Sequence, residues 1–226
     1  MLMNQDIVHV YFVPGMAASS SIFEHIKLPE TQFKMHMLEW LLPIENELID
    51  SYSKRMSELI KHDNVVLIGV SFGGIIVQEM SKFLRVKKLI IISSVKSRYE
   101  LPKRMRLAKF TKAYKFMPTS LVSNLDTLAK YSFATTIKKR LALYKKYLSV
   151  TDKYYLSWAF KQVVCWNQKE PIQGTIHIHG EKDPVFPHKH IGNCITIKGG
   201  THVMIINRYK WFNENLPKLI LEEKLA

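Results

Sequence analysis

The amino-acid sequence predicts an α/β fold, a three-layer sandwich in which helices cover both faces of a mostly parallel sheet of about six strands. Three observations support this prediction. Apolar strand patterns alternate with helical patterns over residues 1–95 and again over residues 170–226. Several strands are continuous runs of branched aliphatic residues, as expected for parallel strands buried on both faces. Residues 65–70 also lead directly through a glycine-bounded turn into a helix, an arrangement typical of α/β domains.

The first part of the chain is predicted to supply four strands in order. Residues 7–13 form an apolar run that ends at Pro14-Gly15, where a turn must follow. Residues 33–40 alternate between apolar and polar side chains, and residues 65–70 and 86–93 are short and rich in Val, Ile and Leu. Three helices are predicted in this part of the chain. One begins at about residues 19–21, and the other two extend over residues 45–61 and 72–84.

The alternation stops between residues 96 and 169, where the sequence becomes basic, helical and rich in aromatic residues. Two stretches there, KRMRLAKFTKAYKF and IKKRLALYKKYL, carry apolar residues at helical spacing. We expect residues 96–169 to form a helical cap inserted into a single core domain made by residues 1–95 and 170–226. The core resumes with strands at residues 175–179 and 194–197 and ends with a helix from about 203 to 223.

The chain carries a formal net charge of +14, from 33 Lys and Arg residues against 19 Asp and Glu residues. Much of the positive charge lies in the predicted cap. A solvated lid that packs through its apolar stripe is the favoured interpretation, and weak contact of the basic cap with an anionic surface stays open. No nucleic-acid motif accompanies the charge, so we predict no nucleic-acid partner.

The apolar runs are shorter than the roughly 18 residues of a membrane span, so no stable membrane insertion is expected. The N-terminal residues lack the basic start of a signal peptide, which favours a cytoplasmic protein. Cys165 and Cys194 have no CxxC spacing and are predicted to be free, buried thiols. The oligomeric state cannot be predicted from these patterns.

A candidate nucleophile lies at Ser71, in the sequence Gly69-Val70-Ser71-Phe72-Gly73. A serine hydroxyl must project from the fold to reach a substrate carbonyl, and it needs a base to remove its proton. Glycines two residues before and after the serine allow the sharp strand-to-helix turn that exposes the hydroxyl. This motif predicts a nucleophile elbow.

The base and the acid are expected in loops that follow later strands. His202 lies after residues 194–197 and before the last helix, so it is the predicted base. A carboxylate that orients this histidine should follow the preceding strand, where Glu181 and Asp183 both occur. Asp183 is favoured because it precedes Pro184 in a rigid loop.

Two backbone amides are predicted to stabilise an oxyanion. One belongs to Phe72, directly after the nucleophile, and the other to Met16, in the loop after the first strand. Other histidines occur near the acid loop: His177, His179, His188 and His190. These lack a third ligand at defined spacing, so neither a metal nor a cofactor is expected.

Five segments resemble the α/β-hydrolase superfamily: VYFVPGMAASSSIF, VVLIGVSFGG, LIIISSVKSR, TIHIHGEKDPVFP and IKGGTHVMIINR. In detail they are similar to small bacterial serine hydrolases that lack the first strands of larger members. The resemblance implies a catalytic triad of Ser71, Asp183 and His202, with the amides of Met16 and Phe72 as the oxyanion hole. The chain departs from many relatives at Pro14-Gly15, where they have His-Gly, and in its Lys- and Tyr-rich cap.

These patterns predict a hydrolase that cleaves a small, fairly apolar carboxylic ester through an acyl-enzyme. Apolar and aromatic residues of the predicted cap are the candidate pocket: Phe110, Tyr114, Met117 and Trp158. Thioester hydrolysis or acyl transfer by the same triad stays open, as does a non-catalytic binding module of the same fold, because fold and triad do not set the substrate. A protein that acts on membrane surfaces or nucleic acids through its basic cap is a further alternative.

Overall fold

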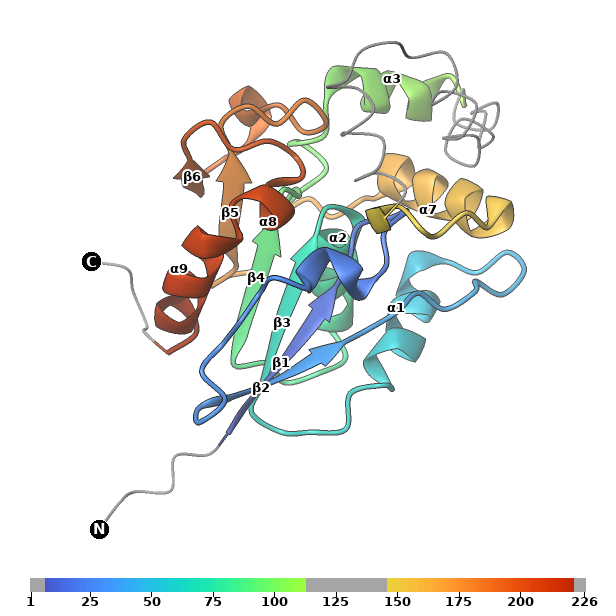
Figure 1. Ribbon diagram of the computed structural model, residues 1–226. Helices are drawn as coiled ribbons and strands as arrows, with labels where there is room; N and C mark the ends of the chain where they lie inside the picture. The colour runs from blue at the N-terminus through green and yellow to red at the C-terminus, as the bar shows by residue number, and fades with distance from the viewer. Residues whose placement is uncertain (1–6, 113–145, 222–226) are drawn as a thin grey trace.

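The computed structural model describes residues 7–112 and 146–221, and in this part of the chain six strands form one parallel sheet (Figure 1). The strand order is β2-β1-β3-β4-β5-β6, and every neighbouring pair is parallel. The strands are β1 (Val8–Val13), β2 (Phe33–Met37), β3 (Val65–Val70), β4 (Lys88–Ile92), β5 (Ile176–Gly180) and β6 (Ile195–Ile197). The α/β fold and the parallel sheet predicted from the sequence are therefore confirmed.

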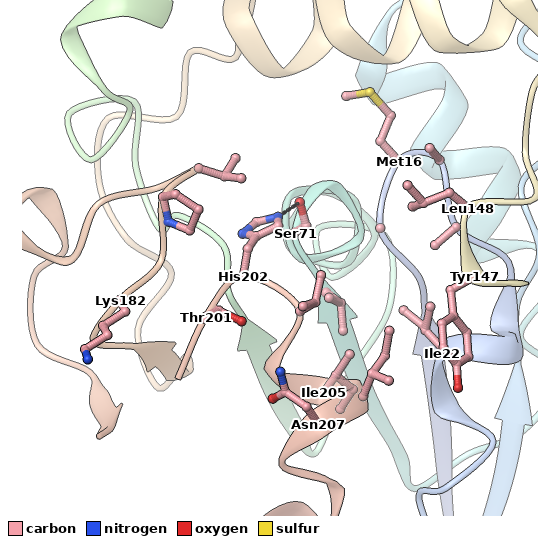
Figure 2. Close-up of a pocket in the computed structure, with 18 residues that line it drawn as sticks. Met16, Ile22, Ser71, Tyr147, Leu148, Lys182, Thr201, His202, Ile205 and Asn207 are labelled. Carbon is pink, nitrogen blue, oxygen red and sulfur yellow. Dashed lines mark hydrogen bonds between the residues drawn. The ribbon is translucent and has the colours of Figure 1, made fainter. Parts of the chain in front are cut away.

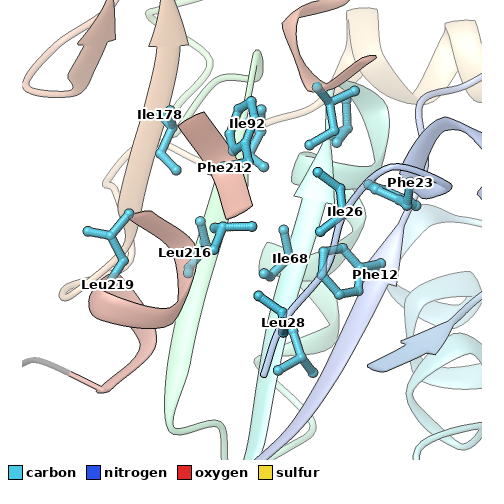
Figure 3. Packing of buried hydrophobic residues seen from close by; sticks show 14 of the residues in the cluster. Phe12, Phe23, Ile26, Leu28, Ile68, Ile92, Ile178, Phe212, Leu216 and Leu219 are labelled. Carbon is cyan, nitrogen blue, oxygen red and sulfur yellow. The ribbon is translucent and has the colours of Figure 1, made fainter. Parts of the chain in front are cut away.

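Alternate residues of each strand supply two separate hydrophobic cores, one on each face of the sheet. On one face, Phe12 and Ile68 lie in the same buried cluster as Phe212 and Leu216 (Figure 3). That face is covered by the 3-10 helix η1 (Ser20–Phe23) and by the helices α8 (Met204–Asn207) and α9 (Tyr209–Leu221).

The opposite face carries the second core, in which Tyr11 and Leu67 pack with Tyr52 and Met56. The helices on this side are α1 (Ile49–Ser57), α2 (Phe72–Met80) and α7 (Lys153–Cys165). Because both faces are covered, the central strand β3 is buried at every position, as its aliphatic sequence predicts.

Two helices differ from the sequence-based expectation. The helix predicted from residue 45 begins only at Ile49, because Asn46 has a left-handed backbone (φ 59°) and the Glu47 carboxylate accepts from the Ile44 amide in a turn. The predicted terminal helix is divided at Arg208, whose φ of −116° and ψ of 19° are not helical. The second part, α9, turns its apolar side to the sheet.

The predicted cap region contains α3 (Lys103–Phe110) and α7, which lie beyond the carboxyl ends of the strands (Figure 1). Residues 113–145 lie outside the described part of the chain, so the division into a core domain and an inserted cap remains a prediction. Cys165 and Cys194 are free thiols, half-buried rather than fully buried. Among the described residues, no helix is long and apolar enough to cross a membrane.

Candidate active site

Ser71 lies at the tip of a sharp turn between β3 and α2. Its backbone has a φ of 54° and a ψ of −118°, an unfavourable conformation for a residue with a side chain. The backbone on either side of the turn is closely packed, and this packing is possible because residues 69 and 73 are glycines. A Cβ on Gly69 would lie 2.2 Å from the Gly73 carbonyl oxygen, and a Cβ on Gly73 would lie 2.2 Å from the Pro14 carbonyl oxygen. Only glycine fits at these two positions, as the elbow motif predicts.

A continuous hydrogen-bonded chain connects Ser71, His202 and Asp183. The distance from His202 Nε2 to Ser71 Oγ is 2.9 Å (Figure 2), and His202 Nδ1 lies 2.8 Å from Asp183 Oδ2. Because a carboxylate only accepts, Nδ1 carries the proton and Nε2 faces the serine hydroxyl as an acceptor. The three residues predicted from separate loops thus meet in an arrangement suited to removing a proton from Ser71 Oγ.

The Asp183 carboxylate is rigidly held. Its side chain is fully buried, and Oδ1 accepts from the amides of Val185 at 2.8 Å and Phe186 at 3.0 Å. The other candidate acid, Glu181, is exposed and accepts from the Gly199 amide instead. The geometry therefore favours Asp183 as the partner of His202.

Two buried histidines of β5 lie behind this acid loop. His179 Nε2 donates to the Phe186 carbonyl at 2.8 Å, so its Nδ1 accepts from His177 Nε2 at 3.1 Å. Burial is the main cause that lowers the pKa of both histidines, to about 2 for His177. They remain neutral at pH 7 and support the loop that carries Asp183, a contact that spacing alone did not reveal.

The predicted oxyanion loop runs beside the nucleophile. A Cβ on Gly15 would lie 3.6 Å from Ser71 Cβ, so the loop after β1 touches the elbow. The Trp40 indole N–H holds this loop by donating to the carbonyls of Gly15 and Ala18, each at 3.1 Å. Among the described residues, the amides of Met16 and Phe72 have no protein acceptor.

A cavity of about 680 Å³ opens onto Ser71 and His202. Its described lining is mainly apolar and comes from η1, from the end of β3, from α8 and from the residues before α7: Ile22, Val70, Tyr147, Leu148, Ile205 and Ile206 (Figure 2). The Tyr147 hydroxyl donates to Glu24, so this polar group is already satisfied by the protein. The cavity suits an apolar group next to the serine.

The pocket predicted from the sequence needs correction. Phe110 is 87% exposed on α3, and Trp158 is buried with its indole N–H donating to the Glu47 carbonyl, so neither lines the cavity. Helical spacing identified apolar stripes but not the direction in which they face. Tyr114 and Met117 lie outside the described residues. Met16, predicted as a backbone donor, also lines the cavity.

The described lining of the cavity offers no set of metal ligands. It contains one histidine, His202, and no Cys, Asp or Glu. His177 and His179 use their facing nitrogens for each other and for Phe186. His188 Nε2 lies 2.9 Å from Thr196 Oγ1 on the exposed side of β6.

A scan against protein-family models finds no match, and a search of curated protein sequences finds none either. Solved structures are clearly similar. A candidate non-heme bromoperoxidase, BpoC, from Mycobacterium tuberculosis has a TM-score of 0.72 at 13% identity, with 98% of this chain and 95% of that chain covered.

Two further similar structures are described as a carboxylesterase and a thioesterase. A carboxylesterase from Nitrososphaera gargenis has a TM-score of 0.68 at 15% identity, with 95% and 90% of the two chains covered. The thioesterase RedJ from the prodiginine pathway of Streptomyces coelicolor has a TM-score of 0.59 at 12% identity, with 94% and 85% covered. At these identities the similarity establishes a common fold.

Proposed function

This chain has the α/β-hydrolase fold, and from that premise we propose that it is a serine hydrolase that cleaves small, fairly apolar carboxylic esters. The observation that carries the proposal is the hydrogen-bonded chain from Asp183 through His202 to Ser71. A triad of this kind is recognised by geometry and by the roles of its members.

In the proposed reaction, His202 Nε2 takes the proton of Ser71 Oγ as that oxygen forms a bond to the ester carbonyl carbon. The amides of Met16 and Phe72 donate to the resulting oxyanion, and Asp183 stabilises the protonated imidazole. The intermediate then expels the alcohol, which receives the proton from His202, and an acyl-enzyme remains on Ser71.

Water completes the cycle. His202, neutral again, takes a proton from a water molecule as its oxygen attacks the acyl carbon, and Ser71 leaves with that proton. Within each half-reaction, His202 carries the proton from the attacking oxygen to the leaving oxygen, and it is neutral between the two. The reaction consumes one ester and one water and yields an acid and an alcohol.

The choice of a modest, apolar ester rests on the cavity. Its described lining is dominated by aliphatic side chains, with Lys182 as a charged exception (Figure 2). Burial of an apolar acyl group against such side chains is favourable by about 25 cal/mol per Å² removed from water. Thioester cleavage and acyl transfer use the same attacking group, so the assay below includes them as outcomes.

A fluorophosphonate probe tests the nucleophile. Wild-type protein should be labelled at Ser71, Ser71→Ala should not be labelled, and the control Ser51→Ala, which changes an exposed serine on α1, should react normally. Absence of labelling in the wild type would leave the chain as a non-catalytic binding module.

A panel of p-nitrophenyl esters then tests the substrate class. Acetyl, butyryl, octanoyl and dodecanoyl esters are compared with the matching acyl thioesters, with and without an added alcohol as acceptor. We expect ester hydrolysis with a preference among these chain lengths. Faster turnover of the thioesters, or transfer to the alcohol, would replace the ester proposal while keeping the role of Ser71.

A further inference from the structure

Three histidines from different elements meet on the face of the sheet that α1 covers, away from the candidate active site. His9 lies on β1, His36 on β2, and His62 in the loop between α1 and β3. The register pairs Tyr11 with His36, and His9 lies two residues before Tyr11, so these side chains share one face. One potential ligand atom from each histidine lies within 4.8 Å of the others.

The contacts among the rings are direct. His9 Nδ1 and His36 Nε2 are 2.9 Å apart, and the rings of His9 and His62 stack with centroids 3.8 Å apart. Two neutral ring nitrogens at 2.9 Å share one proton, so at least one of them already presents a lone pair. A tautomer shift moves the shared proton to the far nitrogen of its ring and frees the second lone pair.

A buried tyrosine orients the third ring. Tyr11 is 3% exposed, and its hydroxyl lies 2.6 Å from His62 Nδ1. With Nδ1 engaged in this bond, Nε2 is the His62 nitrogen left to bind a ligand. Histidines that bind metals are usually held in this way, by a hydrogen bond to the nitrogen that does not coordinate the ion.

A metal ion binds the neutral form of an imidazole. The positive charge near His9 and His36 is that of Lys34. Lys34 opposes the binding of a cation, but its side chain is flexible and it carries a single charge. His62 is exposed, so only its contacts with Tyr11 and His9 limit the movement of its ring toward the other two.

We propose that His9, His36 and His62 bind one divalent transition-metal ion of the zinc class, with water in the remaining position. Zinc–nitrogen bonds of about 2.0–2.1 Å place two ligating nitrogens roughly 3.3 Å apart in a tetrahedral site. The pair at 2.9 Å must therefore open slightly, and His62 must close in. Imidazole ligands favour Zn²⁺, Ni²⁺ and Cu²⁺ over Mg²⁺ and Ca²⁺.

The ion would connect three parts of the fold rather than take part in the proposed hydrolysis. His9 lies near the start of β1, whereas the loop that touches Ser71 follows the end of that strand. A bound ion would link β1, β2 and the segment that leads into β3. Its effect is therefore expected on stability and not on ester turnover.

Isothermal titration calorimetry with ZnCl₂ tests the proposal on the whole chain after removal of metals with a chelator. Cys194→Ser serves as the background, because Cys194 Sγ lies 3.8 Å from His188 Nε2 and offers a competing site. We expect one zinc ion per chain and no heat with MgCl₂. Zinc at 100 times its dissociation constant should raise the Tm by about 5–10 °C.

Three further variants in this background separate the site from general zinc adsorption. His62→Gln should lose at least 100-fold in affinity, and Tyr11→Phe, which removes only the orienting hydroxyl, should lose about 10- to 100-fold. His25→Gln, an exposed histidine outside the cluster, should bind as the background does.

Equal zinc affinity in His62→Gln and His25→Gln, with both folded by circular dichroism, would overturn the proposal. So would absence of a one-to-one zinc isotherm in the background protein. If Tyr11→Phe folds poorly, His62→Gln still decides the matter because His62 is exposed. The zinc isotherm and the Tm shift do not depend on the proposed hydrolase reaction, so the two proposals can fail separately. Ester hydrolysis should be equal with zinc and with chelator.

Discussion

The proposed chemistry depends on which atom of residue 183 faces His202 Nδ1. Oδ1 is fixed by two backbone amides, and Oδ2 accepts from His202 Nδ1. In Asp183→Asn the amide oxygen would stay with the backbone donors, and the NH₂ group would face His202. Nδ1 would then accept, Nε2 would carry the proton, and Ser71 would lose its base.

We therefore expect Asp183→Asn to reduce kcat by about 10⁴-fold with little change in KM. Steady-state hydrolysis of the best p-nitrophenyl ester measures both constants. Glu181→Gln is the matched control, because that exposed carboxylate bonds only the Gly199 amide, and its rate should stay near that of the wild type. A similar loss in both variants would contradict the assignment of the acid.

The structure brings together the residues that a motif pointed to, whereas residues placed by packing were not predicted. Ser71, Asp183 and His202 follow from strand, loop and chain order, and the structure brings them together. Trp40 was missed, because its two bonds to carbonyls in another loop leave no sequence signal. The His9, His36 and His62 cluster was missed because its members come from three elements.

The elbow between β3 and α2 depends on close packing of two backbone segments. A Cβ on Gly73 would lie 2.2 Å from the Pro14 oxygen and 2.4 Å from the Val13 oxygen, and neither backbone atom can move aside easily. We expect Gly73→Ala to lower the free energy of unfolding by about 1–3 kcal/mol or more.

Urea unfolding followed by circular dichroism measures that loss. Gly192→Ala is the control, because its added Cβ would meet only the ends of two side chains, Glu100 at 3.2 Å and Lys96 at 3.9 Å. Its midpoint should stay close to that of the wild type. Equal midpoints for Gly73→Ala and the wild type would show that the elbow has more room than the structure indicates.

The loop after β1 depends on Trp40 for its position. Trp40→Phe removes the indole donor to Gly15 and Ala18 but keeps a ring against Phe72, whose centroid lies 5.3 Å away. Misplacement of the Met16 amide should reduce kcat by about 10- to 100-fold, since small displacements of catalytic groups have effects of this size. KM and the unfolding midpoint should change little, and a change confined to KM would contradict the positioning role.

Elements were predicted more accurately at their centres than at their ends. The run at residues 65–70 coincides with β3, because six consecutive buried aliphatic or glycine positions leave little choice. The ends of α1 and the break at Arg208 depend on one turn and one pair of backbone angles that apolar periodicity does not encode. The order of the strands in the sheet could not be predicted from the sequence pattern either.

The stability of the whole molecule should depend on pH through its buried neutral histidines. Burial lowers the pKa of His177 to about 2, whereas in the unfolded chain it titrates near 6.5. Between these values the unfolded state binds one more proton than the folded state. The contribution of neutral His177 to the free energy of unfolding is therefore fully present above about pH 6.5 and decreases as the pH falls. One such group contributes about 1.4 kcal/mol per pH unit in that window.

Unfolding free energies measured in urea between pH 7.5 and pH 5 check this prediction. On acidification, the free energy of unfolding of His177→Gln should fall less steeply than that of the wild type. The difference in slope should be up to about 1.4 kcal/mol per pH unit, the value for one proton. His179 and the strand histidines His9 and His36 keep part of the slope in both proteins, because their pKa values are also lowered. Parallel curves for the two proteins would contradict the role given to His177.

The sheet order also has a consequence for the time course of synthesis. The strands β2, β1, β3 and β4 are neighbours made from the first 92 residues, whereas β5 and β6 join β4 only after a long intervening segment. Closing so long a loop costs entropy that local strand pairing does not. As the chain leaves the ribosome, Ser71 can therefore be in its turn before Asp183 and His202 have been translated. In the nascent chain the Ser71 hydroxyl would lack its base. The proposed reaction would begin only after synthesis of the last fifth of the chain, which carries Asp183 and His202.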